Sequence, residues 1–90
     1  MAKVEVEILG QKYKIIGEDT EDFLRRVAEF VDLKMKEVLN ESGLVDSYKV
    51  AILTCLIIAD ELLRTKEKLN ELQEEFERKV ESLIKKIEDV

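Results

Sequence analysis

The residues of this sequence that could perform chemistry are few. The chain has no His and a single cysteine, Cys55, so it lacks the commonest general base, the commonest transition-metal ligand and a pair of thiols. Cys55 lies between Thr54 and Leu56 in an apolar stretch, where no cation or His could stabilise a thiolate. We therefore expect a buried packing role for Cys55 and, because disulfides are not indicated, a reducing cytoplasmic setting.

Two acidic pairs, Asp19 with Asp22 and Asp60 with Glu61, are the remaining candidates for acid/base or metal chemistry. Neither pair is accompanied by a third ligand or by the Gly-bearing loop that calcium sites use. The chain also contains no phosphate-binding loop and no nucleophile-elbow motif. Solvated helix charges and helix caps explain the carboxylates better. The sequence therefore predicts a protein that is not an enzyme, with no catalytic residue, no metal site and no cofactor.

The composition favours helices over loops. Hydrophobic residues make up 46% and charged residues 40% of the chain, which leaves little for loops. The absence of Pro and the presence of only three Gly are typical of long helices or a coiled coil. We expect an α+β fold in which a head over residues 1–63 is followed by a coiled-coil tail over residues 64–90.

The head is predicted to begin with a β-hairpin over residues 4–16. Apolar and charged residues alternate before Gly10 and resume their alternation after it, as in a half-buried strand pair. Gly10 and Gln11 are expected to form the two-residue loop. This register pairs Ile8 with Tyr13, and it pairs Val6 with Ile15.

A first helix is predicted over about residues 20–40 and a long second helix from about residue 47. Asp19 or Thr20 could cap the first helix, and Gly43 suits its C-terminal cap. The second helix follows a cap at Asp46 or Ser47, contributes residues 47–63 to the head, and meets no Gly or Pro before the end of the sequence. Its roughly 44 residues would span about 65 Å.

The long helix has too much apolar surface for one chain to cover. Its first part is apolar on every side, and its second part carries a stripe at three- and four-residue steps with an eleven-residue unit from Leu69 to Val80. A head of about sixty residues would be marginal alone, so we expect at least a dimer. We place the core of the head at Val6, Ile8, Val27, Val31, Ile52 and Leu56. The predicted oligomer interface comprises Val50, Leu53, Ile57, Ile58, Leu62, Leu69, Leu72, Phe76, Val80, Leu83 and Ile87.

The charge distribution disfavours nucleic acids and membranes as partners. The net charge is −6, and no contiguous basic surface is visible. The longest uncharged apolar run, residues 50–59, is shorter than the roughly 20 residues that a membrane span needs. The first residues also lack the pattern of a secretory signal.

Three segments together resemble a known family. The hairpin VEVEILGQKYKI, the helix FLRRVAEFVDLKMKEV and the run KVAILTCLIIADELL are similar to those of the bacterial cell division protein ZapA family, over essentially the whole chain. The resemblance implies a dimer that pairs further into an antiparallel tetramer. It also implies binding to the tubulin-like protein FtsZ, whose filaments the family cross-links and aligns at midcell.

The resemblance attributes filament contact to charged residues of the head. Family members often have Arg directly after the hairpin Gly, where this chain has Gln11, and many have Asn in place of Ile57. On this basis the expected FtsZ-binding residues are exposed positions near the hairpin and the start of the second helix: Gln11, Lys12, Lys14, Tyr48 and Lys49.

Other functions are compatible with the same pattern. A generic coiled-coil scaffold or a chaperone-like adaptor would also need a seam along the long helix. Chaperones of the prefoldin type place their hairpin between two long helices, whereas here the hairpin comes first. A ribbon-type DNA binder is disfavoured by Glu5 and Glu7 on the outward face of the hairpin.

Overall fold

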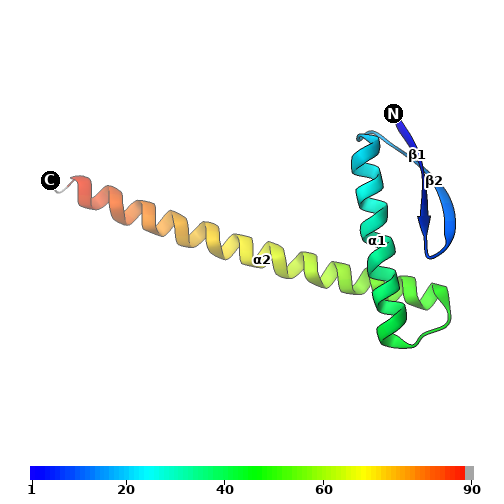
Figure 1. Cartoon of the computed structure of the whole chain (residues 1–90). Helices are drawn as coiled ribbons and strands as arrows, with labels where there is room; N and C mark the ends of the chain where they lie inside the picture. Colours follow the sequence, from blue (N-terminus) through cyan, green and yellow to red (C-terminus); the bar gives the residue numbers. More distant parts are fainter. Residues whose placement is uncertain (89–90) are drawn as a thin grey trace. The chain divides into compact units, whose positions relative to one another are not determined.

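The computed structural model describes residues 1–88, with side chains described up to residue 84. Two antiparallel strands, β1 (Ala2–Ile8) and β2 (Gln11–Gly17), precede two helices, α1 (Glu21–Ser42) and α2 (Ser47–Glu88) (Figure 1). This element order confirms the predicted α+β fold. The side chain of Ile87, one of the predicted interface residues, lies outside the described residues.

The chain divides into two compact units, Met1–Cys55 and Leu56–Val90. The first unit contains the hairpin, α1 and the start of α2. The second contains the rest of α2. The predicted boundary of the head at residue 63 stays a prediction.

The hairpin turn lies one residue earlier than predicted. Leu9 and Gly10 form the loop, with φ angles of 50° and 78°, and two positive φ angles are typical of a type I′ turn. The predicted register is therefore wrong: Ile8 pairs with Gln11, and Val6 pairs with Tyr13. The hydrogen bond from the Leu9 N–H to an Asp32 carboxylate oxygen, at 2.9 Å, supports the unusual backbone conformation of Leu9.

The hairpin and α1 enclose the core of the first unit. Val4, Val6 and Ala28 are buried, and Ile8, Ile15 and Leu24 pack partly buried against them. Glu5 and Glu7, in contrast, are exposed on the outward face of β1. Figure 1 shows the hairpin lying along α1. The predicted assignment of faces is thus confirmed, because a register shift of two residues leaves every side chain on its original face.

Both ends of α1 are capped by the residues that the sequence indicated. The Thr20 hydroxyl accepts a hydrogen bond from the Phe23 N–H at 3.2 Å, which satisfies one of the free donors of the first turn. At the other end, Gly43 adopts a left-handed φ of 68°, and its N–H donates to the Leu39 carbonyl at 3.3 Å. Gly43 therefore ends the helix at low steric cost.

Part of the predicted head core is exposed in the single chain. Val27 is 44% exposed, Ile52 46% and Leu56 63%, so the single chain does not bury them, and their place in the head core would require a second chain. The hairpin covers only one face of α1, and Val27 lies on a neighbouring face with Phe23 and Phe30.

Asp46 caps α2, since its carboxylate accepts a hydrogen bond from the Tyr48 N–H at 2.9 Å. One turn later, Val50 is completely buried in the chain itself, and its place in the oligomer interface stays a prediction. The surface of Val50 is already covered before a second chain binds. Thr54 is buried too, and its hydroxyl donates to the Val50 carbonyl at 2.7 Å.

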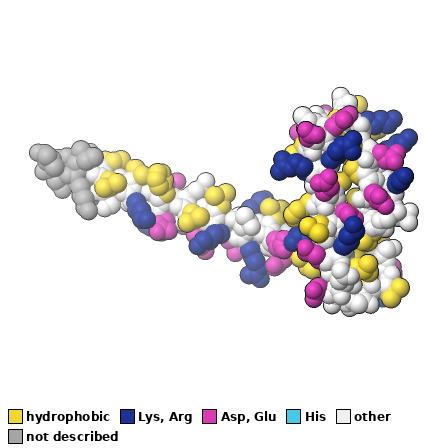
Figure 2. All heavy atoms as spheres, in the orientation of Figure 1, with side chains coloured by type: hydrophobic (Ala, Val, Ile, Leu, Met, Phe, Trp, Pro, Cys, Tyr) yellow, Lys and Arg dark blue, Asp and Glu magenta, His cyan; other side chains and the backbone are white. Residues whose placement is uncertain are grey.

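The second unit consists of a single stretch of helix. Figure 2 shows hydrophobic side chains recurring along it among charged ones. Ion pairs one turn apart lie on its surface, for example Arg64 with Asp60 at 2.9 Å and Lys79 with Glu75 at 3.5 Å. Exposed pairs of this kind contribute little stability, so the apolar side chains of this unit need a partner helix.

Candidate functional site

The hairpin turn is fixed to α1 by a small polar cluster. The Asp32 carboxylate accepts the hydrogen bond from the Leu9 N–H and forms an ion pair with Lys36 at 2.9 Å. The first of these contacts is the larger cause, and together they hold the pKa of Asp32 below its usual value. The same carboxylate raises the pKa of Lys36. The cluster therefore orders a turn whose free N–H would otherwise need water.

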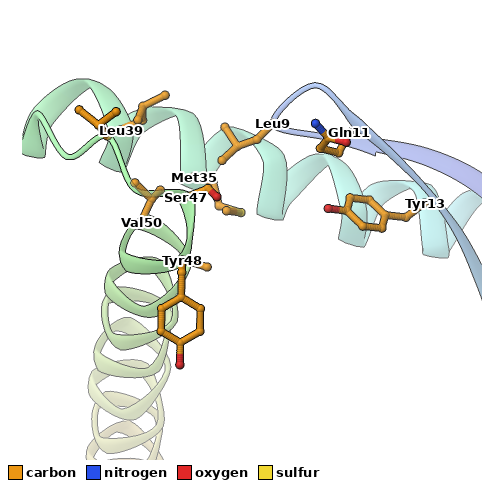
Figure 3. Close-up of a pocket in the computed structure, with 10 residues that line it drawn as sticks. Leu9, Gln11, Tyr13, Met35, Leu39, Ser47, Tyr48 and Val50 are labelled. Atoms are coloured by element: carbon orange, nitrogen blue, oxygen red, sulfur yellow. The ribbon is translucent and has the colours of Figure 1, made fainter.

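A hollow of about 510 Å³ lies beside this turn, within the first unit. Residues from the hairpin, from the second half of α1 and from the start of α2 line it (Figure 3). Leu9, Met35 and Leu39 supply apolar walls, and Gln11 is among the polar groups at its edge. An apolar surface with a few polar groups is the usual composition of a binding site.

The structure brings together only some of the five predicted FtsZ-binding residues. Gln11 and Tyr48 are both exposed and both line the hollow. Lys12 and Lys14 are exposed on the opposite face of the hairpin, where they pair with Glu7 and Glu5 across the strands. Lys49 is exposed in the first turn of α2 and does not line the hollow.

Three further exposed or strained residues at the hollow were not selected from the sequence. Leu9 combines a positive φ with a side chain in the hollow, and Tyr13 and Val45 are 51% and 94% exposed. The sequence did contain a signal for Leu9. Asn or Asp is the preferred residue directly before Gly in a two-residue hairpin turn, and this chain has Leu there. A large apolar residue at such a position points to a use for its side chain.

An exposed apolar stripe follows α1 outside the core. Phe23, Val27 and Phe30 are 46%, 44% and 50% exposed, and their spacing places them on one side of the helix. The Lys34 ammonium lies 5.7 Å from the centre of the Phe30 ring, in the range of a cation–π contact. The hairpin does not cover this stripe, so it is available to another chain.

Several of the predicted interface residues of the second unit are exposed on α2, whereas Ile57, Ile58 and Val80 are half-buried. Leu62, Leu69, Phe76 and Leu83 are each more than half exposed in the single chain. Sequence reasoning placed Ile52 and Leu56 in the core, yet their exposure groups them with these residues. Cys55 is also exposed, so the expected burial of its side chain does not occur within one chain.

Within the described part of the chain, no group of three His, Cys, Asp or Glu side chains could hold a metal ion. Among the same residues, neither helix alone is long and apolar enough to span a membrane; α1 and α2 satisfy that test of length and composition only as a bent pair.

Comparisons with known proteins agree on one family. The family profile described as Cell division protein ZapA matches residues 4–87. The protein named Cell division protein ZapA from Geobacillus kaustophilus is 41% identical over 76 residues, which cover 84% of each chain. Its namesake from Bacillus pumilus is 38% identical over 77 residues, covering 86% of this chain and 91% of the relative.

A solved structure is similar as well. The ZapA mutant dimer from Geobacillus stearothermophilus aligns with a TM-score of 0.65 and 39% sequence identity, covering 84% of this chain and 88% of that chain. The likeness extends to the order of the hairpin and the two helices. Because that relative is a dimer, it supports self-association of this chain.

Proposed function

Because the chain belongs to the cell division protein ZapA family, we propose that it binds FtsZ and cross-links its filaments in the cytoplasm at midcell. The observation that carries this proposal is the family match over residues 4–87. That match covers both the hairpin and the long helix, which would link two binding surfaces.

The filament contact is assigned to the hollow and the residues around it. Gln11 and Tyr48 line the hollow. Lys49 is exposed next to Tyr48 in the sequence, and Lys12 and Lys14 are exposed on the opposite face of the hairpin. The hollow offers apolar walls to a side chain of the partner. The lysines would add attraction to an acidic filament surface, which is strongest at low salt.

Cross-linking is assigned to self-association through α2. A protein that joins two filaments needs at least two binding surfaces, so one copy per filament is not enough. The exposed residues from Leu62 to Leu83 supply apolar area for pairing with other copies. The paired chains would form a dimer, and two dimers would form a tetramer with heads at both ends.

A generic oligomeric scaffold or a chaperone-like adaptor with another partner is the alternative. Both would use the same seam on α2, but neither predicts binding to FtsZ. Sedimentation of polymerised FtsZ with and without this protein separates them. We expect the protein to appear in the pellet only when polymer is present. Protein that stays in the supernatant at every salt concentration would contradict the proposal and favour the scaffold.

A further inference from the structure

β2 is an edge strand, because the described part of the chain contains one sheet of two strands. β1 is the strand that packs on α1, and its inward side chains Val4 and Val6 are buried. Tyr13, which pairs with Val6 across the hairpin, is 51% exposed in contrast. Part of the inward face of β2 is therefore uncovered along its free edge.

The free edge of β2 presents the backbone groups of three residues. Ile8 and Gln11 flank the two-residue turn, so they form a hydrogen-bonded pair, and such pairs alternate with non-hydrogen-bonded pairs along the hairpin. Lys12, Lys14 and Ile16 belong to the second kind of pair. Their N–H and C=O groups therefore point away from β1, where a third strand can bind them.

The charges along the edge of β2 favour an acidic strand. Lys12 and Lys14 are exposed on the outward face, opposite Glu7 and Glu5 of β1. Acidic residues in a third strand would give each ammonium group a second acidic neighbour, and opposite charges on neighbouring strands stabilise a sheet. A second copy of β2 would instead place lysines beside lysines, and lysines at an edge protect natural sheets against such pairing. The edge of β1 carries the two Glu residues, which would repel an acidic strand.

We propose that β2 binds an extended, acidic segment of its partner as a third strand of the sheet. The segment alternates apolar and acidic residues, because its side chains must match the two faces of β2. This proposal rests on the proposed function, which makes the FtsZ filament the source of the segment. It adds the mode of binding and the sequence pattern of the bound segment.

A strand at this edge explains how residues on two faces of the hairpin can serve one partner. Gln11 and Tyr13 line the hollow on the inward face, whereas Lys12 and Lys14 lie on the outward face. Successive side chains of a strand point to opposite faces of a sheet, so one extended segment reaches both sets of residues. A surface docked on either face alone would reach only one set.

The strand pairing is tested by NMR titration of the full-length chain with a synthetic peptide of the pattern Val-Glu-Val-Glu-Val. We expect the amide protons of Lys12, Lys14 and Ile16 to shift to lower field and to exchange more slowly, because each would donate a hydrogen bond to the peptide. A peptide with Lys in place of Glu should leave these amides unchanged. Unchanged edge amides with the acidic peptide, or edge amides that a second copy already protects in its absence, would overturn the proposal.

Sedimentation with FtsZ polymer tests whether the filament uses this edge. Ile16→Pro removes an outward N–H and leaves the hydrogen bonds of the hairpin intact. Ile16→Thr keeps that N–H and loses the same exposed apolar side chain. We expect binding to fall by about tenfold in the Pro variant and by less than about twofold in the Thr variant, because only the Pro variant loses a backbone hydrogen bond.

The two experiments distinguish a failure of the strand pairing from a failure of the proposed function. Equal binding of the Pro and Thr variants, with both shown to be folded by circular dichroism, would overturn the proposal. If the Pro variant does not fold, the peptide titration of the wild type decides. Wild-type protein that stays in the supernatant while the acidic peptide still shifts the edge amides would contradict binding to FtsZ and would support the acidic third strand.

Discussion

The backbone N–H of Leu9 donates a hydrogen bond to the Asp32 carboxylate at 2.9 Å, joining two residues that are 23 positions apart in the sequence. Leu9 is the non-Gly residue with a positive φ in the hairpin turn, and its side chain contributes to the hollow. The contact therefore links a side chain of α1 to the backbone of the turn that shapes the proposed binding surface. A substitution of either residue should change the conformation of the hairpin turn more than it changes the helices.

Replacing Asp32 by Ala should loosen the turn and lower the Tm, because the Leu9 N–H loses its acceptor and Lys36 loses its ionic partner. Asp32→Asn is the matched variant, since its amide oxygen can still accept from Leu9. We expect the Asn variant to melt between the wild type and the Ala variant, followed by circular dichroism. Equal melting of all three proteins would show that the contact is dispensable.

Asp32 should also make stability depend on acid. Its pKa in the fold lies below the ordinary value of 3.8, so the unfolded chain takes up this proton at a higher pH than the folded chain. The contribution of the carboxylate is complete above about pH 5 and is lost as the pH falls through 3.8 towards the lower folded-state value. The Tm advantage of the wild type over Asp32→Asn should therefore be constant between about pH 5 and 7 and shrink below about pH 4. A constant advantage at every pH would refute this assignment.

Leu9→Asn should separate stability from binding. Asn adopts a positive φ more readily than Leu, so the turn should lose strain of about 1 kcal/mol while the hollow loses an apolar wall. We expect an unchanged or higher Tm together with weaker sedimentation with FtsZ polymer. Asn40→Ala, an exposed change on α1 away from the hollow, serves as the control. Undiminished sedimentation of the Leu9 variant would remove Leu9 from the binding surface.

Neutralising Lys12 and Lys49 should weaken filament binding by about three- to tenfold at low salt, if each exposed charge contributes a fraction of a kcal/mol. Gln is preferred to Glu here, because Glu at position 12 would face Glu7 across the hairpin and destabilise the strands. Lys3→Gln with Lys68→Gln changes the net charge equally at other exposed sites. Equal binding of both double variants would show that net charge, and not these two lysines, governs the interaction.

Much of the fold could be predicted because local signals determined it. Alternation identified the strands and their faces, and capping residues located both ends of α1, at Thr20 and Gly43. The hairpin register could not be obtained in the same way. A shift of two residues keeps each face intact, so the pattern does not distinguish Ile8 opposite Tyr13 from Ile8 opposite Gln11. The deciding contact comes from Asp32 on another element.

The sequence shows where the apolar residues are, but it does not determine which of them the single chain leaves exposed. Val27 and Val50 look alike in the sequence, yet Val27 is 44% exposed and Val50 is fully buried. Which of them a second chain can reach depends on the angle at which the hairpin and the helices pack, and hydrophobic spacing alone does not determine that angle. The same limit explains why the five predicted binding residues divide between the two faces of the hairpin and the start of α2.

The central claim is that the first unit binds filaments while pairing through α2 links them. Replacing Phe76 and Leu83 by Lys would remove two exposed apolar side chains of α2 and introduce charges that must stay hydrated, costing on the order of several kcal/mol of association. The residues that form the core of the first unit are untouched. Pairing through the head should survive, so the variant is expected to be a dimer by light scattering that still sediments with FtsZ polymer.

Electron microscopy of FtsZ polymers with the Phe76→Lys/Leu83→Lys variant tests this claim most directly. A head-joined dimer should decorate single filaments without bundling them, because a bridge needs a binding surface at each end. Wild-type protein at the same concentration should produce bundles. Bundles as thick as those of the wild type, formed by a variant confirmed to be a dimer, would contradict the account and favour the generic scaffold.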